Sequence, residues 1–299
     1  MNVAAQAGTA WSRAGISPVF ALQVFGMRRS GNHAIIDWLM RNAPEAATGG
    51  IFYNNCKFGK NPLSAYGSLD IYGAAREVLP HHDIKDVERI AQAGAAPMVI
   101  VSYEDRMPQA PGVTQKASDG FRDAHFAHQV IIYRSFLNWA ASLLAKIKKN
   151  EGFGATDRMR IMALAFATYV QGLDRVVDAA GVIAICYDDW MQSEGYRGRI
   201  LRSLGLPERD MERGKVQRYG GGSSFQDRVA DVDQLGSVSR DAEMADDLEY
   251  QMLMWTAAHD LRFMQRLMPH FEQDAERLAT LAETSKLHLH LPPREAATL

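Results

Sequence analysis

Four short runs of apolar and β-branched residues stand out along the chain. They lie at Val19–Phe25, Met98–Val101, Val130–Tyr133 and Val182–Tyr187. None alternates cleanly between apolar and polar positions, which is typical of strands buried on both faces of a parallel sheet. Helix-like segments separate the runs, so the pattern predicts an α/β fold with a doubly wound, mainly parallel sheet. Ligands of such sheets bind at the C-terminal ends of the strands.

Amphipathic spacing predicts the helices between and after these strands. After the first strand, one helix face carries Ala34, Ile35, Trp38 and Leu39. After the third strand, one face carries Trp139, Ala140, Leu143, Leu144 and Ile147. Further helices are expected at 158–179, at Tyr196–Leu204 with Gly205 as its C-cap, and at Asp241–Phe271. The last of them makes the C-terminal part helical, with Leu248, Met252, Trp255 and Leu261 as its buried candidates.

The composition indicates which classes of partner and which cellular compartment to expect. The 299 residues carry 33 Lys and Arg against 35 Asp and Glu, a net charge of −2, so no general positive field favours nucleic acid or an anionic membrane. No run reaches the roughly 20 apolar residues of a membrane span, so no stable membrane insertion is expected. Two cysteines are too few for a disulfide framework, which indicates a cytoplasmic setting. We interpret residues 1–15 as a flexible leader, 16–286 as a single domain, and 287–299 as a surface or disordered tail.

The segment between the first strand and the first helix carries the strongest chemical signal. Gly26 and Gly31 have the Gly-x4-Gly spacing of a phosphate loop, in which backbone N–H groups and a helix N-terminus surround an anion. In nucleotide hydrolases and kinases the next residues are Lys and Ser or Thr, whose hydroxyl holds Mg²⁺. Here they are Asn32 and His33, while Arg29 supplies a cation inside the loop. The loop is predicted to hold a phosphate rather than to transfer one; the alternative is a plain strand-to-helix turn.

A second anion site is predicted after the third strand. Arg134 follows Val130–Tyr133, and Ser142 comes eight residues later in the next helix. An arginine at the end of a strand can bind a phosphate through two hydrogen bonds, and a serine early in the following helix can add another from the same side. The alternative is that Ser142 only packs between helices.

Three further segments follow in order: VIAICYDDW at Val182–Trp190, ILRSLGL at Ile200–Leu206 and YGGGSSF at Tyr219–Phe225. With Arg29-Ser30-Gly31 and the pair Arg134 and Ser142, this order resembles that of the PAPS-dependent sulfotransferases over residues 19–228. In that family the first loop usually reads Pro-Lys-Ser-Gly-Thr and binds the 5′-phosphosulfate, and the Arg and Ser bind the 3′-phosphate. Arg29 in place of Lys, Asn32 and His33 in place of Thr, and Ser135-Phe136 in place of Asp-Pro leave the subfamily open.

The resemblance implies transfer of a sulfuryl group from 3′-phosphoadenosine 5′-phosphosulfate to a hydroxyl or amine without a metal, which leaves adenosine 3′,5′-bisphosphate. Arg29 would contact the charge that develops between sulfate and phosphate during transfer. The implied nucleotide-binding residues are Arg28, Arg29, Ser30, Gly31, Asn32, His33, Arg134, Ser142, Tyr187, Gly221, Gly222, Ser223 and Ser224. The last four belong to a late loop that closes over the nucleotide in the family, where Arg218 or Arg228 can add charge.

The acceptor must also lose a proton, and the family commonly uses a His or Glu after a middle strand as the base. Here the strand Met98–Val101 leads to Glu104 and Asp105. We expect Glu104 to be the base, with Asp105 second and His33 third. The alternative is that both acids only cap a helix or lie in a solvated loop.

Other functions and sites stay open at the level of sequence. A P-loop small-molecule kinase lacks its Mg²⁺-binding hydroxyl here, and a non-catalytic nucleotide-binding protein would keep the loop and lose the base. We interpret His81-His82-Asp83 as a helix N-cap region and Asp188-Asp189 as loop residues, so no metal is expected. The acceptor pocket is expected in loops at Thr48–Pro80 and Ser102–Asp123, whose aromatic and polar content suits a carbohydrate or a small metabolite.

Overall fold

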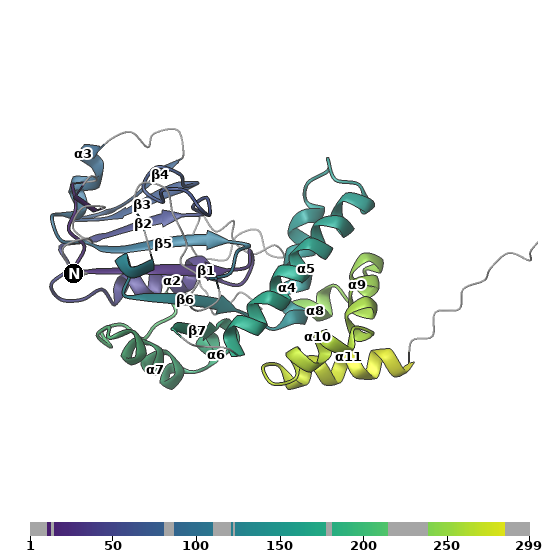
Figure 1. The fold of residues 1–299 in the computed structure, drawn as a ribbon. Helices are drawn as coiled ribbons and strands as arrows, with labels where there is room; N and C mark the ends of the chain where they lie inside the picture. The colour runs from purple at the N-terminus through teal and green to yellow at the C-terminus, as the bar shows by residue number, and fades with distance from the viewer. Residues whose placement is uncertain are drawn as a thin grey trace, which may run out of the picture.

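The computed structural model describes residues 11–12, 15–80, 87–109, 121, 123–177, 181–214 and 239–284. Its centre is a seven-stranded sheet in the order β4-β3-β2-β5-β1-β6-β7 (Figure 1). The strands are β1 (Phe20–Gly26), β2 (Gly50–Asn54), β3 (Ser68–Tyr72), β4 (Arg76–Pro80), β5 (Met98–Glu104), β6 (His128–Tyr133) and β7 (Val182–Cys186). The five neighbouring strands β2, β5, β1, β6 and β7 pair in parallel. At the other edge, β3 pairs antiparallel with β2 and β4 pairs antiparallel with β3. The predicted α/β class with a mainly parallel sheet is confirmed.

The four predicted strands are present as β1, β5, β6 and β7, but each has at least one shifted boundary. β5 continues through Glu104, and Tyr187 begins a helix instead of ending β7. The prediction that Thr48–Pro80 is a loop is wrong, because this segment holds β2, β3 and β4. Each of these strands has only five residues, and β3 carries Asp70 at its centre, so no long apolar run marks them.

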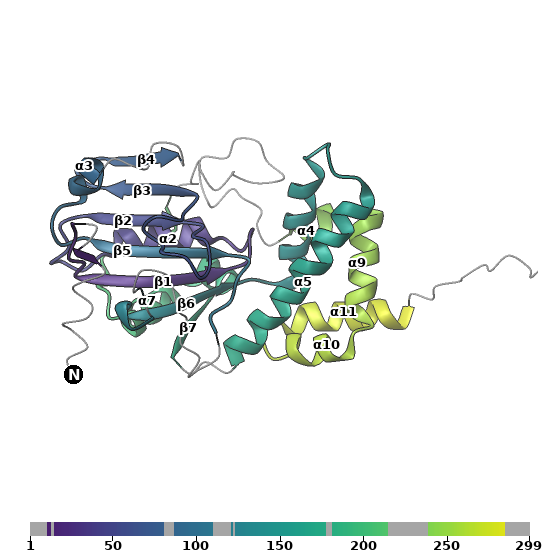
Figure 2. The same ribbon diagram turned by 45° about the horizontal axis from the view of Figure 1, so that its top comes forward.

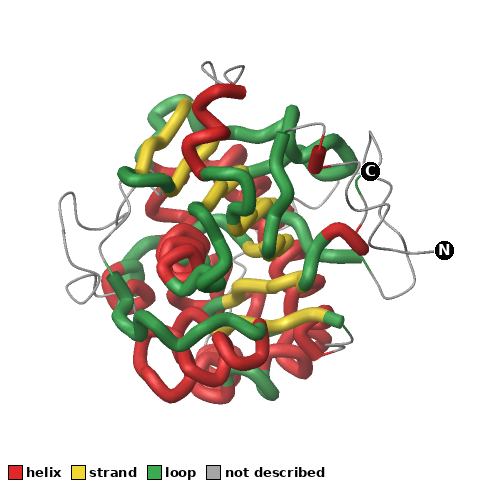
Figure 3. The backbone as a smooth tube through the Cα atoms, turned by 90° about the vertical axis from the view of Figure 1, so that its left-hand side faces the viewer, coloured by secondary structure: helices red, strands yellow, loops and turns green. Residues whose placement is uncertain are grey.

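Side chains alternate between the two faces of the sheet, which explains the continuous apolar runs. One face packs on α2 (Asn32–Arg41), α6 (Tyr187–Gln192) and α7 (Glu194–Leu204), where Trp38 and Trp190 meet with ring centroids 5.9 Å apart. The other face packs on Trp11, Phe121 and Phe126. Viewed along the strands, the sheet is strongly twisted (Figure 3). Both faces are thus covered, as the sequence pattern requires.

The remaining helices gather beyond the ends to which the parallel strands point (Figures 1 and 2). They are α4 (Phe136–Lys148), α5 (Ala155–Val177), α8 (Arg240–Glu243), α9 (Leu248–Ala258), α10 (Leu261–Leu267) and α11 (Glu272–Thr284). Phe136 lies in their shared core, with ring centroids 4.7 Å from Phe263 and 5.4 Å from Tyr169. The predicted apolar face of α4 is buried in the same core. The described residues also form α3 (Val87–Ile90) and the 3₁₀ turns η2 (Ala91–Ala93) and η4 (Asp123–His125).

The prediction of a single long helix at Asp241–Phe271 is wrong, because α8, α9 and α10 occupy this segment. The Asp247 side chain accepts hydrogen bonds from the first N–H groups of α9, and Asp260 does the same for α10. Each aspartate therefore starts a new helix in a new direction. As a result Leu248 and Leu261 are each 75% exposed instead of buried, and Met252 is 59% exposed. By contrast, Gly205 ends α7 in the left-handed conformation as predicted.

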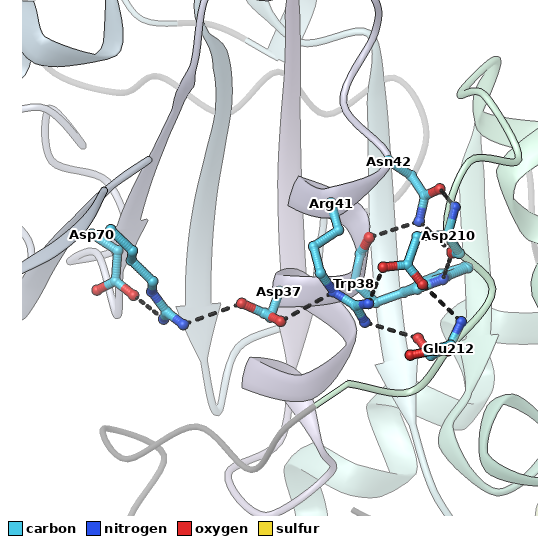
Figure 4. Close-up of polar contacts among 8 residues, drawn as sticks. Asp37, Trp38, Arg41, Asn42, Asp70, Asp210 and Glu212 are labelled. Atoms are coloured by element: carbon cyan, nitrogen blue, oxygen red, sulfur yellow. Dashed lines mark hydrogen bonds and ion pairs between the residues drawn. The ribbon is translucent and has the colours of Figure 1, made fainter. Parts of the chain in front are cut away.

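A chain of ion pairs ties the antiparallel edge of the sheet to α2 (Figure 4). Arg76 of β4 binds Asp70 at 2.5 Å and Asp37 of α2 at 3.1 Å. Asp37 also pairs with Arg41 at 3.4 Å, and Arg41 continues the chain to Asp210. The edge hairpin, α2 and the segment after α7 are thereby joined. Within the described part of the chain, no helix has both the length and the apolar character to cross a membrane.

Candidate anion-binding site

The chain turns from β1 into α2 through residues 27–31, at the edge of the sheet to which the parallel strands point. Gly31 is the N-cap of α2 with a φ of 86°, a left-handed conformation that favours glycine, and no side chain among the described residues caps the helix. The first N–H groups of a helix have no acceptor within it, and the helix dipole is positive at this end. The start of α2 can therefore bind an anion through its backbone.

Three consecutive carbonyl groups of this turn accept hydrogen bonds from side chains around it. The pairs are Met27 O with Asn32 Nδ2 at 3.1 Å, Arg28 O with Trp139 Nε1 at 3.0 Å, and Arg29 O with Arg134 Nη1 at 3.2 Å. The donors come from α2, from α4 and from the end of β6. The turn therefore has a fixed backbone conformation before any ligand binds.

Both glycines of the Gly-x4-Gly spacing are also required by packing. A Cβ atom on Gly26 would overlap the side chain of Asn32, and one on Gly31 would overlap the ring of Tyr187. Tyr187, a predicted site residue, thus lies directly against the turn. Arg29 has a φ of 71°, which is rare for a residue with a side chain and is found where surrounding contacts impose it.

Arg28 and Asp105 join the turn to the end of β5. The Arg28 N–H donates to Asp105 Oδ1 at 2.9 Å, and the Arg28 guanidinium pairs with the same carboxylate. The Asp105 N–H donates to Gly26 O at 3.0 Å. Asp105, the second candidate base, is therefore engaged in holding the turn.

Arg134 lies where the sequence places it, directly after β6, and is only 2% exposed. Its guanidinium lies over the ring of Tyr187, 5.0 Å from the centroid, and its carbonyl accepts a hydrogen bond from the Tyr169 hydroxyl at 2.7 Å. The Ser142 hydroxyl on α4 accepts from Arg29 Nε at 3.3 Å. The two predicted anion sites thus meet, because Arg29 spans from the turn to Ser142.

A residue that the sequence did not indicate also reaches this point. Arg240 of α8 is 5% exposed and donates from Nη1 to Ser142 Oγ at 2.7 Å. No spacing signal could have found it, because 98 residues separate it from Ser142 and it lies in a segment where one long helix was expected.

The buried arginines raise the local positive potential. Burial lowers the pKa of Arg29, and the charge of Arg134 lowers it further. Burial, together with Arg134 and Arg29, lowers the pKa of Arg240 to about 10. Three guanidinium groups that repel one another in a shielded space are stabilised by a bound anion. The arrangement can hold phosphate or sulfate groups by charge and by hydrogen bonds.

The predicted bases Glu104 and His33 lie side by side next to the turn. His33 Nε2 is 4.0 Å from Glu104 Oε1, and Glu104 pairs in register with Gly26. Burial raises the pKa of Glu104 above its ordinary value, and the charge of Asp105 adds to the rise. Burial, helped by Arg76 and Arg29, lowers the pKa of His33 to about 4. At neutral pH the imidazole is uncharged and the carboxylate is more basic than usual.

The expectation that Asp188 lies in a loop is wrong. It lies in the first turn of α6 and accepts a hydrogen bond from the Ser135 N–H at 2.7 Å. Its carboxylate thus fixes the chain directly after Arg134. Other predicted residues, namely Gly221, Gly222, Ser223, Ser224, Arg218, Arg228 and His81-His82-Asp83, lie outside the described residues.

No family model matches the chain, and no curated protein or solved structure matches it either. Among the residues that the structure describes, no three His, Cys, Asp or Glu side chains are grouped so that they could hold a metal ion.

Proposed function

We propose that this protein is a PAPS-dependent sulfotransferase, which transfers the sulfuryl group of 3′-phosphoadenosine 5′-phosphosulfate to a hydroxyl or amine of a carbohydrate or small metabolite. The observation that carries the proposal is the contact between Arg29 Nε and Ser142 Oγ at 3.3 Å. This contact joins the N-terminus of α2 to a second group of buried cations. A nucleotide that carries phosphate groups on both the 3′ and the 5′ position of one ribose requires two neighbouring anion sites.

The sheet order supports the finer fold assignment. β5 and β2 lie on one side of β1, and β6 and β7 lie on the other. In doubly wound sheets this reversal of strand order marks the crevice in which ligands bind, outside the carboxyl ends of the strands. We therefore place the 5′-phosphosulfate at residues 27–33 and the 3′-phosphate at Arg134 and Ser142.

We assign the steps of sulfuryl transfer to particular residues of this chain. Arg29 and the N–H groups at the start of α2 stabilise the negative charge that grows on the oxygen bridging sulfur and phosphorus. Glu104 takes the proton of the acceptor hydroxyl as the new oxygen–sulfur bond forms. The bond between sulfur and the bridging oxygen breaks, and adenosine 3′,5′-bisphosphate leaves with the electron pair.

The acceptor would enter beside Glu104. His33 stands next to it, 4.0 Å away, and the buried ring of Phe52 packs edge-on against the imidazole with ring centroids 5.8 Å apart. Residues 55–67 follow β2 at the same end of the sheet as Glu104. A partly exposed imidazole next to a carboxylate suits a small hydroxylated acceptor such as a sugar or a metabolite.

Calorimetry with adenosine 3′,5′-bisphosphate, adenosine 5′-phosphate and ATP with Mg²⁺ tests the proposal. The bisphosphate should bind far more tightly than the monophosphate and without Mg²⁺. Arg134→Ala should cost about 1.5–3 kcal/mol of that affinity, because a charge-assisted hydrogen bond is lost. Arg202→Ala, at an exposed arginine paired with Glu208, is the matched control.

Each alternative has its own result. Equal binding of the two adenosine nucleotides would show that the 3′-phosphate site is wrong. A preference for ATP with Mg²⁺ would indicate a kinase. Tight binding of the bisphosphate with no sulfuryl transfer to a panel of glycans and phenols would indicate a non-catalytic nucleotide-binding protein.

A further inference from the structure

We propose that the C-terminal helices complete the nucleotide site: Arg240 of α8 binds the same phosphate as Arg134 and Ser142, and an ion pair between Asp241 and Arg277 positions it. This inference rests on the proposed function, and it assigns a ligand-binding role to a part of the chain outside every motif of the sequence. It also predicts which nucleotides the site selects.

Two guanidinium groups meet at Ser142. Its hydroxyl oxygen accepts from Arg240 Nη1 at 2.7 Å and from Arg29 Nε at 3.3 Å. Two guanidinium groups from remote segments therefore approach the same small side chain, and Arg134 adds a third charge that both of them sense. Glu104 offsets part of this repulsion at Arg29 and Glu243 part of it at Arg240, and an anion bound at Ser142 would offset more of it.

Helix α8 is held in place by contacts with α4 and α11. The Arg240 N–H donates to Asn138 Oδ1 of α4 at 2.9 Å, and the Asn138 amide donates to Ser135 Oγ at 3.3 Å. On the other side Asp241, itself 6% exposed, pairs with Arg277 of α11. A helix of four residues has almost no stability of its own. The contacts with α4 and α11 therefore decide where the Arg240 guanidinium lies.

The number of charges indicates the ligand. A phosphate monoester carries close to two negative charges at neutral pH, whereas a sulfate ester or a phosphodiester carries one. A second guanidinium at Ser142 favours the dianion, because each added cation gains more from two charges than from one. Arg240 is thus assigned to recognition of a terminal phosphate monoester, and it should raise the preference for adenosine 3′,5′-bisphosphate over adenosine 5′-phosphate.

The test measures the affinities of both nucleotides for the full chain and for Arg240→Ala and Arg240→Lys. Arg240→Ala should weaken bisphosphate binding about 10- to 100-fold and monophosphate binding far less, as expected for loss of one charged hydrogen-bond donor. Arg240→Lys, which keeps the charge, should recover part of the loss. The matched control is Arg262→Ala, at an exposed arginine of α10.

The positioning pair is tested separately. Arg277→Gln should raise the KM for the sulfuryl donor several-fold with little change in kcat, and Arg277→Lys should restore it. A purely structural pair would instead lower the melting temperature while the ratio of the two nucleotide affinities stays at the wild-type value. That second result would overturn the positioning role.

Two outcomes separate this inference from the proposed function. If Arg240→Ala binds the bisphosphate like the wild type, the inference is wrong and the sulfotransferase assignment stands. If the wild type does not bind the bisphosphate, but inorganic phosphate raises its melting temperature and Arg240→Ala abolishes the rise, the assignment is wrong and Arg240 remains an anion ligand. No response to either compound would overturn both.

Discussion

His33 Nε2 lies 4.0 Å from Glu104 Oε1, beside the turn between β1 and α2. Their pKa values move in opposite directions, upward for Glu104 and downward to about 4 for His33, and burial is the main cause in both. Burial disfavours whichever form is charged. The pair therefore keeps a neutral ring beside a carboxylate that binds a proton more readily than an exposed one.

Glu104→Gln should reduce turnover by about 10²- to 10⁴-fold, because the variant keeps the shape of the side chain and loses its basicity. Affinity for adenosine 3′,5′-bisphosphate and the melting temperature should barely change. Steady-state kinetics and calorimetry on the same preparation measure both. If Glu104→Gln stays active while Asp105→Asn or His33→Ala is inactive, the base is one of those two residues.

The pH profile gives an independent check on Glu104. Only the ionised carboxylate accepts a proton, so kcat/KM should rise with pH through the pKa of Glu104. Because burial raises that pKa, the acidic limb should lie above the ordinary value of 4.5 for glutamate. Replacement of Glu104 by Gln should abolish this limb in whatever activity remains. An acidic limb at the ordinary value would mean that the proton acceptor is exposed.

His33 should make the fold sensitive to acid. Its pKa is about 4 in the folded protein against 6.5 for the ordinary side chain, so it contributes stability above pH 6.5 that is lost as the pH falls toward 4. His33→Asn should reduce the loss in the free energy of unfolding between pH 7 and pH 4 by about 3 kcal/mol. Urea denaturation at the two pH values measures it.

Arg29→Ala should lower kcat by about a hundredfold or more, with a smaller loss of nucleotide affinity, because Arg29 acts on charge that grows during transfer. Arg29→Lys should retain part of the rate. Single-turnover kinetics with bound nucleotide separates the two effects. Near-normal turnover of Arg29→Ala would transfer the role to Arg28 or His33.

Gly31→Ala and Gly205→Ala separate backbone strain from overlap with a neighbour. Both glycines have a left-handed φ, 86° and 70°, but an added Cβ meets the Tyr187 ring only at Gly31 and has open space at Gly205. Gly205→Ala should lower the free energy of unfolding by about 1 kcal/mol through strain alone. Gly31→Ala should lower it by about 2–4 kcal/mol and weaken nucleotide binding. Equal effects would mean that Tyr187 moves aside freely.

The sequence was sufficient for the parts of the structure that are encoded locally. Long apolar runs mark β1, β5, β6 and β7, because strands buried on both faces need apolar side chains at nearly every position. The glycine spacing marks the turn after β1, since the left-handed Gly31 and the close contact with Tyr187 both exclude a larger residue.

The features that were not predicted from the sequence depend on particular side-chain contacts, some between distant segments and some local. Contacts with α4 and α11 bring Arg240 to Ser142, and no motif in the sequence around Arg240 indicates this contact. The strand β3 carries Asp70 at its centre because Arg76 neutralises it there, so the usual apolar signature is missing. Asp247 and Asp260 broke the expected C-terminal helix through capping, a local effect that the apolar periodicity concealed.

The position of β4 at the end of the sheet bears on how the protein behaves at high concentration. An outermost strand offers a row of backbone donors and acceptors to which another molecule can add a strand. β4 carries the consecutive charged residues Arg76 and Glu77, one on each face of the strand, and ends at Pro80, which has no N–H to donate. These residues oppose intermolecular strand pairing. Replacing Glu77 by valine would therefore promote aggregation, a loss of solubility that no assay of nucleotide binding would reveal.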